Sequence, residues 1–600
     1  MKRSTYIWSL LVGCVAFATS CDLTENVQVK ADKSMIFGSK SGLELYSNSF
    51  YKALPTLKNG FMQDKMCDVG AVSNTDTFIK RGAYNTETAT SWSWGALKNV
   101  NYFIDGCNDP KYCTVEAETR DNYLGIARWF RAWFYYDKLT TYGEVPWFPN
   151  DIQSYQNDVM YKDRDSRDVI IRNLIADLDF AYEHIQATSS TGSATLTRWA
   201  AAALKSRVCL FEAAYRRYHN LTGLEITPEE LYREAAKAAK LVIDNSGCSL
   251  NTAAGKKGAY RDLFYSETPL TQEVILAVCA NEKSGIFGEQ NWWFNARSYG
   301  LCWSLVRSFV HTYLKQDGTP FTAAADYAVK SFAEEMEGRD LRLEQTVRGR
   351  NFLWDGKTAV ADIKNLSLTG YQVIKYTLDE SKYDGGAKNI NSIPLIRYAE
   401  VLLNYAEAQA ELGVITDSEW ALTVGALRKR AGITGGTETL PTTVDSYLQR
   451  TFYPDVTSPV LLEIRRERAI ELVAEGMRFD DLRRWKCGSL METLPWSGIH
   501  IPGLEQPVDV NGDGVNDYYF TEGEVASAPA AYKNIAVRVN QDGVGLYAEA
   551  NPVSGYDLVY KTGAGDRYWY PDGRQYLYPI PAKVIRDYRN AGYTISQNPE

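Results

Sequence analysis

The sequence predicts a mainly α-helical protein whose helical hairpins form a scaffold for a loop-rich, irregular subdomain. Apolar side chains recur at helical spacing in several segments of residues 34–246 and 393–487. Short turns join consecutive helical segments, and a short connection favours antiparallel pairing of its two helices. Residues 247–392 and 488–600 instead contain short apolar runs among many glycine and aromatic residues. We therefore expect two helical regions and two irregular ones.

Residues 1–21 have the composition of a lipoprotein signal. A basic start precedes Ile7–Phe17, an apolar run that is too short to span a bilayer. The next motif ends at Cys21 and resembles a lipobox, so Cys21 is the predicted lipidation site; the alternative is an ordinary secretory signal with a chance cysteine. Residues 22–33 are polar and predict a flexible tether. No later run is long and apolar enough for a membrane-spanning helix, so the lipid alone would attach the protein to the membrane.

The composition argues against several classes of function. A formal net charge of −9, with basic residues spread among the acids, gives no basic surface for nucleic acid. The 4 histidines are far apart and no Cys-x-x-Cys pair occurs, so neither a histidine-rich metal centre nor a structural zinc site is expected. Cys107 and Cys113 flank a turn short enough for a disulfide bond, which export of the protein would permit.

The predicted helices of the first region follow one another closely. Each has apolar residues at helical spacing, as Leu43, Tyr46 and Phe50 show for the first. The predicted ranges are 38–56, 92–106, 114–141, 167–186, 197–219 and 228–245. Their order and their short connections predict successive hairpins.

A further hairpin is predicted between residues 396–412 and 418–431. Gly413 can end the first of these helices, because glycine readily adopts the left-handed conformation found there. Thr416 and Glu419 have the spacing of a capping box at the start of the second helix, in which each side chain accepts a hydrogen bond from the other residue's backbone N–H.

Four glutamates form one stripe on the next predicted helix, which Ser458 and Pro459 begin and Gly476 ends. They are Glu463, Glu467, Glu471 and Glu475, and Arg466, Arg468 and Arg478 lie three residues from the first, third and fourth of them. Glu467 has no such neighbour, so we expect its partner to come from elsewhere in the fold. This lattice is either a catalytic carboxylate cluster or a structural ion-pair network, and the network is the favoured interpretation.

The densest group of aromatic residues lies among glycines and shows no helical or strand pattern. It contains Trp292, Trp293, Tyr299 and Trp303. Aromatic rings exposed in a loop suit the C–H faces of sugars; the alternative is a local aromatic core. A second candidate group consists of Asp76, Arg81, Trp92 and Trp94. Its two charged side chains could bracket the hydroxyl groups of a sugar.

Oxygen-bearing side chains recur in one segment near the C-terminus. Asp509, Asn511, Asp513 and Asp517 occupy positions one, three, five and nine of a loop with glycine at position six, as in a calcium-binding loop. Phe520 stands where an EF-hand has glutamate, so the segment is not an EF-hand. The pattern predicts a structural calcium ion, or else a simple turn rich in Asn, Asp and Gly. No other cofactor is expected.

Several enzyme signatures are missing from the sequence. It contains no GxSxG elbow, HExxH helix or Rossmann glycine pattern, and Asp355–Thr358 lacks the earlier glycine of a phosphate loop. A carboxylate pair for glycoside hydrolysis stays open, because the separation of the two groups is a spatial quantity.

Three motifs together resemble one known family. They are IPLIRYAEVLLNYAEAQAELG (residues 393–413), RRERAIELVAEGMRFDDLRRW (465–485) and YLYPIPAKVI (576–585). In order and spacing they are similar to the signatures of the SusD/RagB-like nutrient-binding lipoproteins of Bacteroidetes outer membranes. The resemblance implies a tetratricopeptide-like (SusD-like) helical scaffold and a lipid anchor in the outer membrane, at the cell surface. It also implies a SusC-like TonB-dependent transporter as partner and a ligand face that draws on both aromatic groups.

The leading hypothesis is a cell-surface protein that binds an oligosaccharide and delivers it to that transporter without catalysis. The alternatives are a non-glycan nutrient such as a peptide, a surface glycoside hydrolase, and a purely structural interaction module. The expected organisation is a signal (1–21), a tether (22–33), a helical scaffold (34–246), an aromatic subdomain (247–392), a second helical scaffold (393–487) and a loop-rich C-terminal segment (488–600).

Overall fold

A computed structural model of the 600-residue chain describes residues 33–58, 64, 66–295 and 302–599. The predicted signal, Cys21 and residues 22–32 of the predicted tether lie outside this range, and so does Tyr299. One large cluster of buried apolar side chains extends from Phe37 to Ile580. The helical and the irregular regions are therefore joined by a common core.

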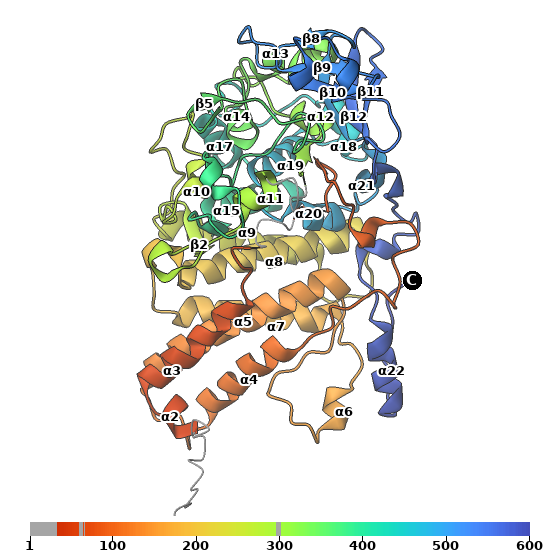
Figure 1. Cartoon of the computed structure of the whole chain (residues 1–600). Coiled ribbons are helices and arrows are strands. Elements are labelled where there is room, and N and C mark those ends of the chain that lie inside the picture. The colour runs from red at the N-terminus through yellow and green to blue at the C-terminus, as the bar shows by residue number, and fades with distance from the viewer. Residues whose placement is uncertain (1–32, 59–63, 65, 296–301, 600) are drawn as a thin grey trace, which may run out of the picture.

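The N-terminal region consists of helices that pack in series. Its elements are α2 (Lys33–Phe37), α3 (Lys40–Ser47), η1 (Asn48–Ala53), β1 (Gly70–Ala71), η3 (Thr77–Ile79), α4 (Gly95–Asn108), α5 (Ala117–Tyr142), α6 (Asn157–Met160), α7 (Arg167–His184), η4 (Thr191–Ser193), α8 (Arg198–Tyr218) and α9 (Pro228–Asn245). Helix α5 packs against α4 and α7, and α8 packs against α7 and α9. Figure 1 shows this stack at one end of the molecule. The prediction of a mainly helical scaffold is confirmed.

Local capping chemistry fixes where α8 and α9 begin. The Thr197 side chain accepts a hydrogen bond from the Ala200 N–H at the start of α8. At the start of α9, Thr227 and Glu230 form a capping box, and Pro228 occupies the first turn, where its missing N–H has no cost. These helices begin within a residue of their predicted starts because the signals are local.

The first predicted helix, 38–56, is wrong as a single element. The chain forms α2, α3 and the 3-10 helix η1, with a break at Gly38. Ser39 caps α3 by accepting a hydrogen bond from the Gly42 N–H. Helix α4 likewise begins at Gly95 instead of residue 92, so that Trp94 is its N-cap residue. Cys107 and Cys113 are free thiols.

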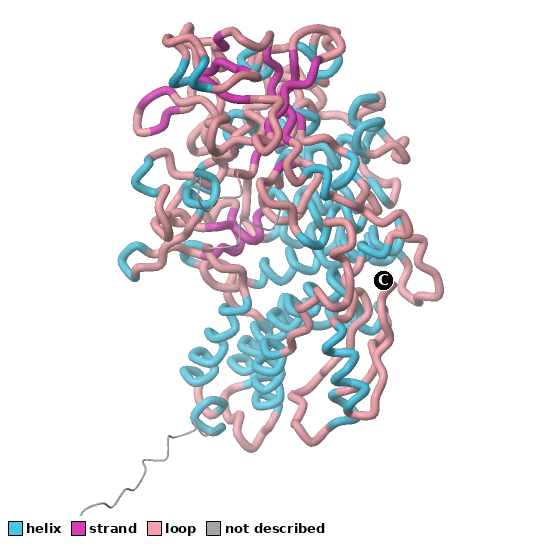
Figure 2. Tube along the Cα trace, turned by 45° about the vertical axis from the view of Figure 1, so that its right-hand side comes forward, coloured by secondary structure: helices cyan, strands magenta, loops and turns pink. Residues whose placement is uncertain are grey.

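The described residues of the segment 247–392 form only short elements. Besides four 3-10 helices, they are α10 (Asp262–Tyr265), β2 (Val274–Val278), α11 (Gln290–Asn295), β3 (Ser304–Leu305), α12 (Arg307–Val310), α13 (Phe332–Met336), α14 (Arg342–Thr346), β4 (Leu353–Trp354) and β5 (Lys357–Thr358). Strand β1 pairs with β3, and β4 pairs with β5, both antiparallel. Long segments of loop connect these elements, as Figure 2 shows.

The second helical region follows a strand that was not predicted. Its elements are β6 (Ile393–Arg397), α15 (Tyr398–Glu411), α16 (Asp417–Leu422), α17 (Val424–Arg430), α18 (Ser446–Phe452), α19 (Pro459–Glu471), α20 (Arg478–Arg484) and α21 (Leu490–Thr493). Strand β6 pairs antiparallel with β2, so Ile396 belongs to a sheet instead of the predicted helix. The predicted capping box of Thr416 and Glu419 is confirmed. The helix predicted over 418–431 is divided at Thr423 into α16 and α17.

The C-terminal segment forms two small sheets and a final helix. Its elements are β7 (Ser497–Ile501), β8 (Pro507–Val508), β9 (Tyr518–Thr521), β10 (Ala536–Arg538), β11 (Leu546–Ala550), β12 (Tyr556–Tyr560) and α22 (Ala582–Asn590). The strand orders are β11-β12-β7 and β10-β9-β8. Helix α22 lies apart from these sheets and extends alongside the N-terminal helices (Figure 1).

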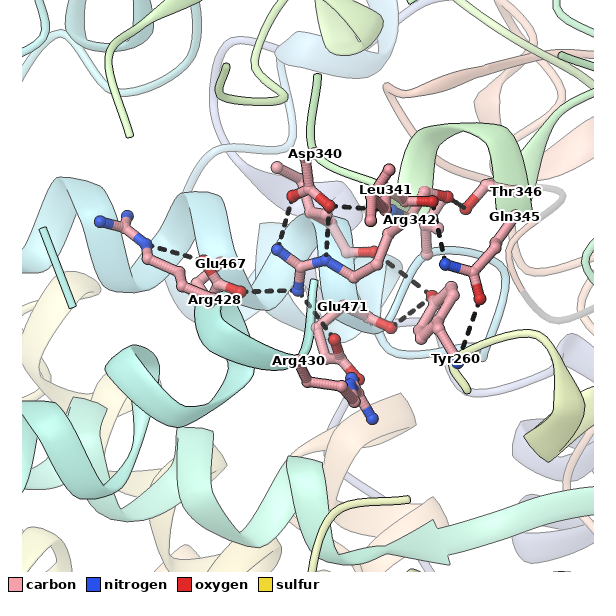
Figure 3. Close-up of polar contacts among 12 residues, drawn as sticks. Tyr260, Asp340, Leu341, Arg342, Gln345, Thr346, Arg428, Arg430, Glu467 and Glu471 are labelled. Atoms are coloured by element: carbon pink, nitrogen blue, oxygen red, sulfur yellow. Dashed lines mark hydrogen bonds and ion pairs between the residues drawn. The ribbon is translucent and has the colours of Figure 1, made fainter. Parts of the chain in front are cut away.

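The glutamates of α19 form a buried ion-pair network with arginines of α14, α17 and β6. Ser458 and Pro459 begin α19 as predicted, but the helix ends at Glu471, five residues before Gly476. Glu467 pairs with Arg342 of α14 (2.6 Å) and Arg428 of α17 (3.2 Å), which confirms that its partners come from elsewhere (Figure 3).

Two of the three predicted local pairs in this network are wrong. Glu463 does pair with Arg466 at 3.2 Å. Arg468, predicted to pair with Glu471, binds Asp481 instead, and Arg478, predicted to pair with Glu475, binds Asp68. The two glutamates instead form ion pairs with cationic side chains from distant elements. Glu471 contacts Arg342, Arg397 and Arg430, and Glu475 contacts Lys375 and Arg397.

A second buried carboxylate gives the fold a predictable acid response. Glu335 is fully buried and contacts His311 Nε2 (2.8 Å), Arg307 Nε (3.1 Å) and the Tyr371 hydroxyl (2.6 Å). Burial alone would raise the pKa of Glu335, but the hydrogen bond with His311 and the charge of Arg307 outweigh it and hold the pKa at about 2, below its ordinary 4.5. A depressed carboxyl pKa contributes stability that is present above pH 4.5 and lost as the pH falls toward 2.

The native protein is expected to have a higher free energy of unfolding than Glu335→Gln at pH 5. We expect this difference to decrease by about 3 kcal/mol between pH 5 and pH 2. Urea unfolding at several pH values measures this difference. Glu337→Gln, on the exposed side of the same segment, is the matched control and is expected to show no such trend. A difference for Glu335→Gln that stays constant with pH would contradict the assignment.

Candidate binding site

The start of α4 and helix α22 line a cavity of about 800 Å³, which we call the α4–α22 cavity. Its aromatic residues come from parts of the chain that are far apart in sequence. They are Trp92, Trp94, Phe148, Tyr161 and Tyr588. The cavity is of the size that binding sites for small ligands usually have, and it is lined by both rings and polar groups.

Ring packing holds the two tryptophans of this cavity in place. Trp92 and Trp94 meet edge to face, with centroids 5.3 Å apart and planes at 72°. Trp92 also contacts Tyr142 (4.9 Å), and Trp94 contacts Phe148 (5.2 Å). Both tryptophans are half-buried. Each ring is thus fixed by the core and lines the cavity, which is the arrangement that stacking on a flat ligand requires.

The opposite wall is built by α22 and the segment around α6. Tyr161 meets Tyr588 edge to face at 5.2 Å. The Tyr588 hydroxyl donates a hydrogen bond to the Lys162 carbonyl (3.2 Å), which ties α22 to this segment. The aromatic lining therefore depends on the docking of the C-terminal helix.

Asn101 supplies a fixed polar group to the cavity wall. Its side chain is only 1% exposed, and its Nδ2 donates to the carbonyls of Phe148 (2.8 Å) and Asn150 (3.1 Å). Its Oδ1 accepts no hydrogen bond within the described part of the chain. Lys98, one turn earlier on α4, is exposed at the same wall. Rings with fixed amide and charged groups between them can hold both the faces and the hydroxyls of a sugar.

The two charged residues predicted for this region lie outside the cavity. Asp76 caps η3 by accepting a hydrogen bond from the Phe78 N–H (3.0 Å). The Arg81 guanidinium lies 4.0 Å from the centre of the Tyr568 ring. Neither residue lines the α4–α22 cavity. The structure therefore unites the predicted tryptophans of this group but not its charged pair.

The other predicted aromatic group is part of a helix and of the core. Trp292 and Trp293 are half-buried on α11, which the sequence did not predict, and they do not line the α4–α22 cavity. Trp303 is 5% exposed, which fits the alternative interpretation of a local aromatic core for this residue. It is covered by the backbone of Gly70, where an added Cβ would lie 2.3 Å from Trp303 Nε1.

The predicted calcium residues form a hydrogen-bonded turn. The Asp509 carboxylate accepts bonds from the N–H groups of Gly512 and Gly514, both at 2.7 Å, and Asp517 accepts one from Val510 (2.8 Å). Asn511 donates to Asp513. Among the residues that the structure describes, no group of three or more His, Cys, Asp or Glu side chains is arranged to hold a metal ion. Calcium at this loop stays a prediction.

Sequence reasoning missed Asn101, Tyr161 and Tyr588. Asn101 lies seven residues after Trp94, on the same face of α4, so helical spacing could have found it. Tyr161 and Tyr588 offered no such signal. They meet only because α22 returns to the N-terminal helices, and no local pattern shows that contact.

Solved structures define the fold class. The chain resembles a SusD-like carbohydrate binding protein from Bacteroides fragilis NCTC 9343, with a TM-score of 0.65 and 19% identity over 93% of this chain and 99% of that chain. A second SusD-like protein from the same organism gives a TM-score of 0.64 and 20% identity over 94% and 97%. A SusD superfamily protein from Parabacteroides distasonis ATCC 8503 gives 0.55 and 17% over 93% and 98%. At these identities the likeness establishes a SusD-like fold.

The SusD family model matches residues 272–600, more than half of the chain, and the chain belongs to this family. SusD family proteins are non-catalytic binding proteins, so the prediction that the chain is not an enzyme is confirmed and the hydrolase alternative is rejected. Among curated proteins the comparison finds no match. Within the described residues, each helix is either too short or too polar to cross a bilayer.

Proposed function

We propose that the protein binds an oligosaccharide nutrient in the α4–α22 cavity and passes it to a SusC-like TonB-dependent transporter without cleaving it. The observation that carries this proposal is the cavity itself, in which Trp92 and Trp94 are fixed by ring packing beside the buried amide of Asn101. The carbohydrate-binding relative from Bacteroides fragilis supports the choice of ligand. Lipid on Cys21 would hold the protein at the outer membrane, on the cell surface.

A glycan panel tests the choice of ligand. The protein without its predicted signal is titrated with oligosaccharides and with peptides by calorimetry, and the mixtures are then assayed for new reducing ends. Binding of an oligosaccharide that is recovered intact is the expected result. Binding of peptides alone would favour a different nutrient, and loss of intact oligosaccharide would contradict the absence of catalysis.

Two cellular measurements test the anchor and the partner. Replacing the predicted lipidated residue, Cys21→Ser, is expected to move the protein from the membrane fraction to the soluble fraction. The native protein is expected to co-purify with a TonB-dependent β-barrel. A variant that stays in the membrane, or a purification that yields no such barrel, would contradict the corresponding part of the proposal.

We also propose that the loop of Asp509, Asn511, Asp513 and Asp517 takes up calcium as a structural ion. Burial and the nearby charges of Asp513 and Asp509 raise the pKa of the Asp517 carboxyl, and a bound cation would relieve this repulsion. Calcium is expected to raise the melting temperature in native protein treated with EDTA, and not in Asp513→Asn. Equal melting temperatures with and without calcium would mean that the hydrogen-bonded turn is complete by itself.

A further inference from the structure

A second cavity, of about 670 Å³, lies against the other side of α4. We call it the α4–α5 cavity, because α5 supplies four of its aromatic residues, Phe130, Trp133, Phe134 and Tyr136. The Trp133 ring stacks on Trp129, with centroids 5.4 Å apart and planes at 12°. Trp129 is fully buried, so its packing fixes the orientation of the half-buried Trp133 ring. Ring packing fixes Trp92 and Trp94 in the same way.

The two cavities meet at the N-terminus of α4. Ala96, Asn99 and Val100 line the α4–α5 cavity. Leu97, Lys98 and Asn101 line the α4–α22 cavity. These two sets occupy opposite faces of a helix, because successive residues are about 100° apart. Gly95 alone among the residues of α4 lines both cavities.

Aromatic contact is continuous between the two cavities. Phe134, from the α4–α5 cavity, packs on Trp94, from the α4–α22 cavity, with ring centroids 5.5 Å apart. Gly95 is exposed, and a Cβ added to it would meet nothing within 4 Å. No side chain caps α4, since its N-cap residue is Trp94. A ligand can therefore cross the end of the helix at Gly95, where the first backbone N–H groups are available as donors.

The charged groups in the cavity walls are largely paired, either with each other or with residues behind the wall. In the α4–α22 cavity, Lys583 pairs with Asp587 (2.6 Å) and Arg586 with Glu87 (3.3 Å). In the α4–α5 cavity, Arg207 pairs with Glu400 at 2.6 Å. In the same cavity, Glu475 pairs with Lys375 and Asp480 with Arg483. Walls whose charges are neutralised in this way favour an uncharged ligand over an acidic one.

We infer that the two cavities are subsites of one site for a linear, uncharged oligosaccharide that crosses the N-terminus of α4 at Gly95. This inference rests on the proposed function and extends it to chain length and charge. The helix with its side chains is about 10–12 Å wide, so the ligand must be long enough to reach over it. Two linked segments bound at once gain about 100-fold or more in affinity over either segment alone.

Calorimetry with a series of uncharged oligosaccharides of increasing length tests the inference. A hexasaccharide is expected to bind the native protein about 100-fold more tightly than the disaccharide of the same series. Gly95→Phe, which places a ring between the cavities, is expected to remove this advantage, so that the two sugars bind the variant with similar affinity. Gly95→Ala is the matched control and should retain the advantage, since it has space around its Cβ. Trp133→Ala, which removes a ring from the α4–α5 cavity, should likewise reduce the ratio of the two affinities.

The remaining outcomes separate a failure of the two-subsite inference from a failure of the proposed function. Equal affinities for the two chain lengths, or no effect of Gly95→Phe and Trp133→Ala on the hexasaccharide, would overturn the two-subsite inference and leave the proposed function standing. Tighter binding of an acidic hexasaccharide would overturn the assignment of an uncharged ligand. If neither sugar of any series bound, the proposed function itself would fail. Circular dichroism and the melting temperature of each variant show whether its fold is retained.

Discussion

Glu471→Gln is expected to lower the free energy of unfolding by about 3–5 kcal/mol, because it removes the central anion from a buried network. The Glu471 carboxylate is fully buried and lies 2.8 Å from Arg342 and 2.6 Å from Arg397. It also contacts Arg430. Burial opposes its charge, but these arginines outweigh burial and hold the pKa of Glu471 well below its ordinary value. A neutral glutamine would leave three guanidinium groups with too little negative charge around them.

Chemical denaturation of both proteins measures this loss. Glu438→Gln is the matched control: Glu438 pairs with Lys429 at 2.6 Å, but its side chain is 65% exposed. Exposed pairs contribute about 0–1 kcal/mol, so this variant is expected to unfold much like the native protein. If Glu471→Gln were also within about 1 kcal/mol of the native protein, the buried network would contribute no more to stability than an exposed ion pair.

Trp92→Ala is expected to weaken oligosaccharide binding at least about 30-fold, since truncating a central aromatic contact commonly costs about 2 kcal/mol or more. The ring is fixed against Trp94 and Tyr142, so a sugar stacks on it without first ordering a mobile side chain. Calorimetry with the sugar found in the glycan panel measures the change.

Trp292→Ala is the matched control for this substitution. Trp292 is also half-buried and was also predicted to bind sugar, but it lies outside both cavities. Its removal is expected to leave the affinity within a few-fold of native. A large loss with Trp292→Ala and none with Trp92→Ala would place the binding site on α11 instead.

The helical scaffold was predictable where its signals are local. Thr227, Pro228 and Glu230 define the start of α9 by themselves, and Ser458 with Pro459 does so for α19. Strand β6 could not be found in this way. Its apolar run fits a buried strand or a helix equally well, and its partner β2 begins at Val274, more than a hundred residues earlier.

Side-chain partners were less predictable than helices, because the partners come from segments that are far apart in the sequence. The i to i+3 spacing correctly predicted the ion pair of Glu463 with Arg466 but failed for Glu471. The Glu471 carboxylate instead pairs with arginines from α14, α17 and β6. Among the candidate binding residues, Trp92 and Trp94 do line a cavity, whereas Trp303 is covered by Gly70. Whether a ring is exposed depends on which distant backbone covers it, and composition does not encode that.

A crystal structure of the protein with the bound hexasaccharide would show where the sugar lies. We expect sugar rings stacked on Trp92 and Trp94 in the α4–α22 cavity, with the sugar chain continuing past Gly95 and with its glycosidic bonds intact. Sugar bound against Trp292 on α11, with the α4–α22 cavity empty, would contradict this expectation.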